Sequence, residues 1–256
     1  MSKLASWSRL SGEDKALEKL EKYELSEDCL EQLHEYALTL QEYNSHTNLV
    51  ANADLAVLLK DHILDALQLQ PVLRKIVQDK KFEETNRTAL IDIGSGAGFP
   101  GMILAITVPF LKVTLLDSIG KKCRFLESAA HKLGLDDRVS VICDRAEVVA
   151  HDKRHRERYS FATARAVGAL PMVAELCIPF LRYSGYLLAQ RSKRQATEEE
   201  QIIDAYASRL GGELVSVTHF DPDILGRELS LIQIKKTKTT PPRFPRSAAA
   251  MKKDAG

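Results

Sequence analysis

The stretch IDIGSGAGFPGM, residues 91–102, decides the fold class of this chain. It joins a β-branched run to three glycines at alternate positions, Gly94, Gly96 and Gly98. A residue without Cβ either permits a positive φ or lets a ligand approach the main-chain N–H groups. One glycine is enough for a tight strand-to-helix turn, so three of them favour a loop that contacts a ligand.

The spacing of these glycines separates two kinds of nucleotide-binding loop. A dinucleotide fingerprint G-x-G-x-x-G requires glycine at position 99, where this chain has Phe99. The pattern present is D-x-G-x-G-x-G, which begins at Asp92 and makes Asp92, Gly94, Gly96 and Gly98 candidate contacts of a cofactor. It resembles the first motif of class I S-adenosylmethionine (AdoMet) methyltransferases, and that resemblance implies AdoMet as the cofactor.

The composition is that of an ordinary globular protein. Hydrophobic residues make up 45% of the 256 residues and charged residues 28%. The four cysteines are far apart and form no CxxC pair, which favours neither a metal cluster nor a disulfide framework. The N-terminus lacks the apolar core of a signal peptide, and the longest apolar stretch is too short to span a bilayer. We therefore expect a cytoplasmic protein, a monomer, without a metal or a membrane segment.

Apolar runs that alternate with amphipathic stretches predict the architecture. Alternating β and α units predict an α/β fold, a doubly wound and mostly parallel sheet that binds its ligand at the carboxyl ends of the strands. The last two strand candidates have no helix between them, which predicts a terminal antiparallel hairpin. The expected division is a helical extension at 1–80, a methyltransferase domain at 81–236 and a basic, flexible tail at 237–256. The strand candidates are 89–94, 111–117, 138–144, 159–167, 185–190, 214–220 and 229–235.

Polar residues at the ends of the second and third strand candidates are cofactor-site candidates. The second strand ends at Asp117, whose carboxylate can accept hydrogen bonds from both hydroxyls of a ribose; a cap for the next helix is the alternative. The third ends at Asp144, and polar groups there, Glu147 among them, can bracket an adenine. Glu147 is equally compatible with a plain surface carboxylate.

The fourth strand candidate ends in TARAV, residues 163–167, and lies where this fold places the methyl group. This segment contains no carboxylate, histidine or cysteine, so it offers no general base and no covalent nucleophile. The acceptor must then be nucleophilic at neutral pH without losing a proton, as N7 of guanine is. Arg165 can donate to O6 of such a guanine, and an ion pair within the sheet is the competing role.

Two basic runs are candidate contacts for a polyanion. HDKRHRER at 151–158 lies in mid-chain, and residues 235–256 carry seven basic residues against one acidic residue. A run of this kind is also typical of a solvated loop, but two of them favour a surface that faces RNA. The candidate RNA contacts are Lys153, Arg154, Arg156, Arg158, Arg243 and Arg246.

With these residues in place, the sequence closely resembles the RsmG family, also called glucose-inhibited division protein B. The resemblance is carried by YNSHTNLV (43–50), DHILDAL (61–67), the glycine loop, LLDSIGKKCRFLE, RAE, TARAV, GRELSLIQIKK and the closing PRFPR. It implies a methyltransferase acting on N7 of a guanine in the 530 loop of 16S rRNA, with that RNA or the small ribosomal subunit as partner. The implied cofactor contacts are Gly94, Phe99, Asp117, Ser118, Ile119, Ala146, Glu147 and Arg165.

The sequence departs from this family at two places and leaves rival functions open. Arg191-Ser192 stands where the family often has Lys-Gly, and Asn48-Leu49-Val50 replaces the usual Asn-Leu-Thr. Arg191 keeps its charge and stays a candidate RNA contact. His62 and Asp65 lie in a motif like the family's, where either packing or a site role fits. The alternatives are a class I methyltransferase acting on another RNA or a small molecule, and a nonenzymatic RNA-binding protein with a vestigial fold.

Overall fold

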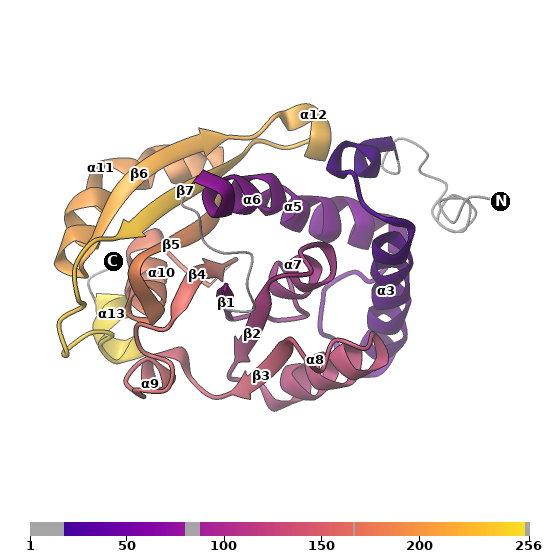
Figure 1. Cartoon of the computed structure of the whole chain (residues 1–256), viewed down its shortest axis with the longest axis horizontal. Helices are drawn as coiled ribbons and strands as arrows, with labels where there is room; N and C mark the ends of the chain where they lie inside the picture. The colour runs from indigo at the N-terminus through magenta and orange to yellow at the C-terminus, as the bar shows by residue number, and fades with distance from the viewer. Residues whose placement is uncertain (1–17, 80–87, 166, 254–256) are drawn as a thin grey trace.

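A seven-stranded sheet forms the centre of the protein, in a computed structural model that describes residues 18–79, 88–165 and 167–253 (Figure 1). The strand order is β3-β2-β1-β4-β5-β7-β6. The first five strands pair in parallel, and β7 is antiparallel to both of its neighbours. The expected doubly wound, mostly parallel sheet is thus confirmed. The strands are β1 Ala89–Ile93, β2 Lys112–Asp117, β3 Val139–Cys143, β4 Tyr159–Ala164, β5 Leu181–Ser192, β6 Gly212–His219 and β7 Leu229–Lys236.

The sheet separates two hydrophobic cores because successive side chains of a strand point to opposite faces. In β1, Leu90 belongs to one core and Ile91 to the other, and in β7, Leu231 and Ile232 divide in the same way. Near-continuous apolar strands are what a sheet buried on both faces requires. The second core is covered by α9 Ala146–Val149, α10 Leu170–Cys177, η3 Ile178–Phe180, α11 Lys193–Arg209 and α13 Ala248–Lys253.

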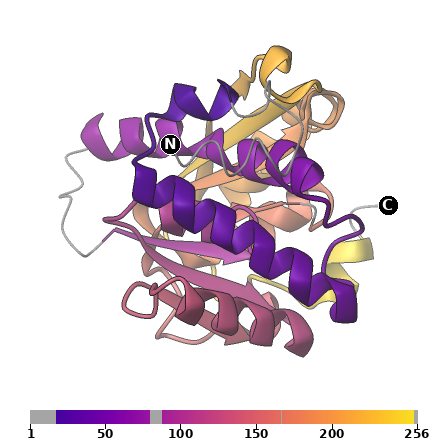
Figure 2. The ribbon, with the colours of Figure 1, turned by 90° about the vertical axis from the view of Figure 1, so that its right-hand side faces the viewer.

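The N-terminal helices cover the first core together with α7 and α8, as Figure 2 shows with α3 in front. The side chain of Ser26 accepts a hydrogen bond from Cys29 N and so caps α3, as the sequence predicts. Because these helices and the sheet share one core, the extension is part of the same packed unit; the expected boundary at 80/81 lies outside the described residues. The helices of this layer are η1 Glu21–Tyr23, α3 Glu27–Thr47, α4 Leu55–Val57, η2 Leu58–Ile63, α5 Leu64–Leu67, α6 Leu69–Asp79, α7 Gly101–Thr107 and α8 Gly120–Lys132.

The element η2 is a π-helix inside the longer helical run 55–67. Its amide groups bond to carbonyls five residues back, so that Leu64 N donates to Leu59 O. Such wide turns are rare and occur frequently at functional sites. The turn carries Asp61 and His62, and α5 directly after it carries Asp65.

The C-terminal part differs from the sequence expectation in two respects. The antiparallel pair β6 and β7 is present, but a short helix, α12 Pro222–Leu225, joins the strands, and β7 lies between β5 and β6. Residues 237–253 are not a flexible tail, because Phe244 and Thr240 are buried and α13 packs on the second core. The guanidinium of Arg156 holds this segment by donating to the carbonyl oxygens of Ala150, Thr240, Pro241 and Phe244.

Candidate active site

The three glycines of the loop after β1 all have positive φ, between 61° and 90°. A Cβ on Gly94 would lie 2.9 Å from Val167 Cγ2, and one on Gly98 would lie 2.9 Å from Met102 Cβ. A Cβ on Gly96 would have only a backbone oxygen within 4 Å, at 3.8 Å. Packing therefore explains two of the glycines, whereas Gly96 borders open space that a ligand can use.

The loop is fixed from two sides. Asp92 is fully buried, and its carboxylate accepts hydrogen bonds from Gly101 N and Thr163 Oγ1, each at 3.0 Å. Burial raises the pKa of this carboxyl to about 6. On the other side, the hydroxyl of Tyr36 in α3 donates to the carbonyl oxygen of Ala97. Asp92, expected as a cofactor contact, thus supports the loop from below and does not face the surface.

Asp117 ends β2 beside this loop. Its Oδ2 accepts from Gly96 N and its Oδ1 from Ile119 N, both at 2.9 Å. The carboxylate therefore connects the ends of the first two strands and also caps the turn before α8. Ser118 and Ile119 are exposed next to it, so the expected cofactor contacts on the first two strands lie together at one edge of the sheet.

The third strand contributes α9, which begins at Ala146. Ala146 is 8% exposed, and Glu147 is half-buried with its carboxylate 3.8 Å from Arg145 Nη1. Both residues follow the carboxyl end of β3, which pairs with β2 at Asp117 and Cys143. The expected adenine side of the site is thus next to the expected ribose side.

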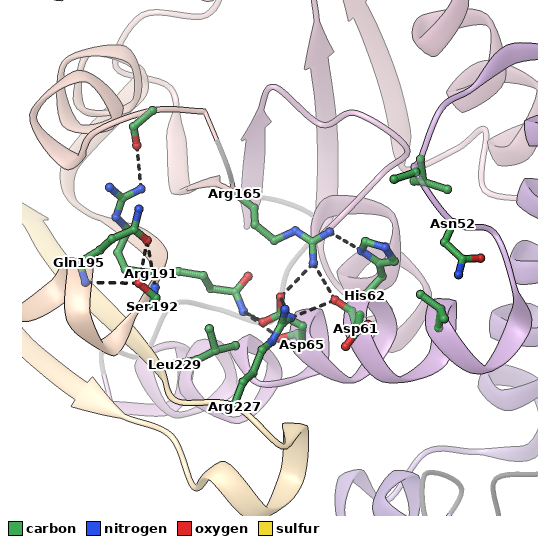
Figure 3. Close-up of a pocket in the computed structure, with 15 residues that line it drawn as sticks. Asn52, Asp61, His62, Asp65, Arg165, Arg191, Ser192, Gln195, Arg227 and Leu229 are labelled. Atoms are coloured by element: carbon green, nitrogen blue, oxygen red, sulfur yellow. Dashed lines mark hydrogen bonds and ion pairs between the residues drawn. The ribbon is translucent and has the colours of Figure 1, made fainter.

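A pocket of about 740 Å³ opens beside the loop, at the carboxyl ends of β4 and β5 (Figure 3). Three arginines, Arg165, Arg191 and Arg227, line it together with Asp61 and Asp65. The walls come from four segments of the chain, 50–65, 165–168, 190–195 and 227–229. The glycine loop is not among the lining residues, so the pocket is a second compartment next to the expected cofactor side.

Asp65 is the centre of the polar network in this pocket. Its side chain is 5% exposed, and its Oδ2 accepts from Arg165 Nη1 at 2.9 Å and from Arg227 Nη2 at 3.1 Å. Its Oδ1 accepts from Gln190 Nε2 at 2.9 Å. Figure 3 shows Arg165 and Arg227 converging on this carboxylate from opposite sides. One buried charge therefore joins the end of β4, the end of β5 and the segment before β7.

The π-helix η2 provides the remaining hydrogen-bond partners of Arg165. The carbonyl oxygen of Asp61 accepts from both Arg165 Nη1 (3.3 Å) and Arg227 Nη2 (3.1 Å), and His62 Nδ1 lies 2.6 Å from Arg165 Nη2. The ring of Phe99 is stacked on the ring of His62, with their centroids 4.8 Å apart. The centroid of the Phe99 ring also lies 5.4 Å from Arg165 Cζ. Burial and the neighbouring Arg165 lower the pKa of His62 to about 4, so the imidazole is neutral and its Nδ1 accepts.

The candidate RNA contacts do not gather at this pocket. The loop 151–158 precedes β4 and bonds to Pro179 and Phe180 ahead of β5. It therefore lies at the amino ends of these strands, on the opposite side of the sheet from the pocket at their carboxyl ends. There Arg156 binds backbone carbonyls, and Arg246 forms an ion pair with the buried Glu175 at 2.8 Å. Lys153, Arg154 and Arg158 are exposed, and the guanidinium of Arg243 lies over Phe244.

Arg191 is the member of that set that lines the pocket. Its guanidinium donates to both carboxylate oxygens of Glu199, at 2.8 and 2.5 Å, and to Gly168 O at 2.8 Å. The side chain is 4% exposed. Arg191 thus supports the wall of the pocket, and its remaining capacity to contact RNA is small.

Sequence reasoning did not single out several residues that build this region. Gln190, Arg227 and Tyr36 were not candidates, although Gln190 is a polar residue at the end of an apolar run and Arg227 lies in the GREL segment. Tyr36 occupies a core position of α3, and nothing in the helical pattern indicates that its hydroxyl reaches the glycine loop. Arg165 follows β4 and is not inside a strand that continues to 167.

Two negative findings bound the chemistry of the described residues. No helix in the described ranges is both long and apolar enough to cross a membrane. Within the same ranges, no cluster of three or more His, Cys, Asp or Glu side chains is arranged to hold a metal ion.

The sheet order with a reversed seventh strand, the glycine loop after β1 and the acidic residue at the end of β2 define a class I AdoMet-dependent methyltransferase. The comparison with known proteins gives the family. A protein-family sequence model described as "GidB: rRNA small subunit methyltransferase G" matches residues 29–225. The chain belongs to this family.

Relatives in this family cover nearly the whole chain. A ribosomal RNA small subunit methyltransferase G from Listeria welshimeri is 36% identical over 223 residues, 87% of this chain and 89% of that protein. One of the same name from Alkaliphilus metalliredigens is 35% identical over 88% of this chain and 89% of that protein. Among solved structures, M. jannaschii TYW2 in complex with AdoMet is similar with a TM-score of 0.47 and 14% identity, over 63% of this chain and 76% of that chain.

Proposed function

We propose that this protein transfers a methyl group from AdoMet to N7 of a guanine in the 530 loop of 16S rRNA. The observation that carries the proposal is the pocket at the carboxyl ends of β4 and β5. It is lined by three arginines and by a neutral His62, next to a glycine loop that leaves space for a ligand. The family to which the chain belongs supports RNA as the substrate.

The residues around the glycine loop fit AdoMet. Gly96 leaves room for the ligand, and Asp117 presents a carboxylate at the end of β2 for the ribose hydroxyls. Ser118, Ile119, Ala146 and Glu147 follow the ends of β2 and β3 and would surround the adenine. AdoMet supplies an electrophilic methyl group on a positively charged sulfur when it is bound.

The work of the pocket is to position the acceptor. N7 of guanine has an in-plane lone pair and carries no proton, so no residue has to remove one. The two titratable side chains bonded to Arg165 do not serve as general bases at neutral pH: His62 has a pKa of about 4 and accepts from Arg165, and Asp65 is already engaged by two arginines. Rate enhancement then comes from orientation of the guanine and from the fixed charges around it.

The RNA approaches the edge of the sheet that carries the pocket. Arg194 is the second residue of α11, two positions after the pocket residue Ser192, and its side chain is 83% exposed with Glu198 3.9 Å away. Lys193 and Arg227 also lie on this rim, with ion-pair partners Glu228 and Asp65. We propose that this rim, and not the loop 151–158, holds the phosphates on either side of the target guanine. The protein would act in the cytoplasm as a monomer, with the RNA or the small subunit as its partner.

Mass spectrometry of 16S rRNA tests the proposed function. RNA from cells lacking this gene should lose one methyl group from a guanine of the 530 loop, and the purified protein with AdoMet should restore it. Chemical cleavage specific for 7-methylguanosine identifies the modified atom. Methylation of a metabolite extract in the absence of any RNA methylation would instead support a small-molecule methyltransferase.

A further inference from the structure

One buried amide in the pocket uses only half of its hydrogen-bonding capacity. Gln190, near the end of β5, is 6% exposed and lines the pocket. Its Nε2 donates to the backbone carbonyl of Asp65 at 2.8 Å and to Asp65 Oδ1 at 2.9 Å. Its Oε1 is buried and has no hydrogen-bond partner among the residues that the structure describes. Buried acceptors are nearly always satisfied in native proteins, so this one requires an explanation.

The orientation of this amide is fixed by Asp65. Exchanging the oxygen and nitrogen of Gln190 would direct Oε1 at two other acceptors, the carbonyl and the carboxylate of Asp65. The unpaired group of this pocket-lining side chain is therefore an acceptor and not a donor. The same carboxylate holds the guanidinium of Arg165 through its other oxygen, at 2.9 Å. Asp65 thus fixes a donor side chain, Arg165, on one oxygen and the amide of Gln190, with its unpaired acceptor, on the other.

This order of donor and acceptor matches guanine. The purine has an acceptor, O6, beside a donor, N1–H, and the N2 amine follows on the same edge. Adenine carries the opposite order, with a donor amine at C6 and an acceptor at N1, so it would face Arg165 with a donor and Gln190 with an acceptor. A site built for one order rejects the other because buried polar groups are left unpaired.

We propose that Gln190 is the specificity-determining residue of the acceptor pocket: its Oε1 accepts from an N–H of the Watson–Crick edge of the target guanine, while Arg165 donates to O6. This arrangement leaves N7, on the other side of O6, free to face the methyl group. The inference rests on the proposed function, in which the acceptor is a guanine, and it adds how that guanine is distinguished from adenine.

The test compares three purines in an RNA fragment of the 530 loop, each placed at the target position. Guanosine, inosine and 2-aminopurine riboside all keep N7, but inosine lacks the N2 amine, and 2-aminopurine riboside lacks O6 and N1–H. For wild-type protein and Gln190→Leu, kcat/KM is measured on each RNA. Gln190→Leu should lose about tenfold on guanosine, and its preference for guanosine over one of the two analogues should shrink by about tenfold. Equal preferences in both proteins for both analogues would overturn the proposal.

A second glutamine in the same pocket is the matched control. Gln195 lines the pocket, but its Oε1 is already used by Ser192 N (3.3 Å) and Ser192 Oγ (3.0 Å) in a capping box. Gln195→Leu should leave the preference among the three purines unchanged. AdoMet affinity and thermal unfolding show that each variant is folded, and Gln190→Met replaces the leucine variant if that one is not.

The same experiment separates this inference from the proposed function. If wild-type protein does not methylate N7 of the guanosine RNA, the proposed function fails. If it does so and the two proteins show equal preferences, only the role of Gln190 fails.

Discussion

Replacing Asp65 by asparagine should break part of the hydrogen-bond network that joins Arg165 and Gln190 in the pocket. Asparagine keeps the shape of the side chain but has one acceptor oxygen in place of two, and it carries no charge. In whichever way its amide is turned, an N–H group faces either Gln190 Nε2 or the guanidinium of Arg165, both of which are donors. The variant must therefore lose at least one of these contacts and the charge that holds Arg165.

The structure sets the size of the effect. The side chains of Asp65 and Arg165 are 5% and 19% exposed, so their charge-assisted contact is little screened and contributes about 1.5–3 kcal/mol. Arg227 is 42% exposed, and its share is discounted because solvent screens it. With the added loss of the hydrogen bond from the uncharged Gln190 amide, Asp65→Asn should lower the free energy of unfolding by about 2–4 kcal/mol. It should also slow methyl transfer at least about tenfold, since Arg165 loses its orientation.

Urea unfolding and single-turnover transfer at saturating AdoMet measure the two effects separately. The control is Glu175→Gln, because Glu175 is also fully buried and pairs with Arg246 at 2.8 Å, but on the other face of the sheet. It should cost similar stability without changing the transfer rate of the folded protein. Transfer by Asp65→Asn at the wild-type rate, or an equal loss of rate in both variants, would refute a positioning role for Asp65.

Three further predictions concern the cofactor, the RNA and the pH dependence. Gly96→Val should abolish AdoMet binding in a protein that still folds. The control is Gly134→Val, at a similar φ (67° against 61°) with nothing within 4 Å of the added Cβ, which should cause the backbone strain alone. Equal AdoMet affinities of the two variants would mean that the loop at Gly96 is only a turn. Arg194→Ala should raise the KM for RNA and reduce its salt dependence by about one counterion. Arg154→Ala, with the same 83% exposure but at the amino ends of the strands, should change neither. The reverse result would place the RNA on the loop 151–158. The single-turnover rate should be flat from about pH 7 to 9, because the pKa of His62 lies near 4 and that of Asp92, which fixes the glycine loop, near 6. A pKa near seven that disappears in His62→Gln would contradict the absence of a base.

The lowered pKa of His62 also makes the stability of the folded protein depend on pH. The folded protein binds this proton less readily than the unfolded chain, whose histidine has its usual pKa of about 6.5. Between about pH 6.5 and 4 the unfolded state therefore binds more protons, and the stability due to His62 falls as the pH is lowered through this window.

The strands and the glycine loop could be predicted because their signals are local. A mainly apolar run marks each parallel strand, and Asp117 stands at a strand end that the sequence itself delimits. The strand end at Ala164 was misplaced by three residues, since Ala166 and Val167 prolong the apolar pattern beyond the point where Arg165 turns into the pocket.

The polar network could not be predicted because its contacts join residues far apart in the sequence. Asp65 and Gln190 are separated by 125 positions, and Tyr36 reaches the glycine loop over 61. The charged run at 151–158 gave the opposite difficulty. Arg156 looks like a solvated or RNA-facing residue in sequence, but its donors are used by backbone carbonyls of a segment more than 80 positions away. Charge alone does not distinguish these two uses of an arginine.

The place of β7 in the sheet constrains how the chain can fold during its synthesis. Among the strands that the structure describes, the sixth, Gly212–His219, pairs with β7 alone, and Leu229–Lys236 closes the hydrogen-bonding edge of β5. Until residue 236 has left the synthesis machinery, β6 has nothing to pair with and the apolar strand β5 presents an open edge, which is a template for aggregation. A nascent chain arrested before Leu229 should therefore require protection by a chaperone, although β1 to β5 can already pair in their final order.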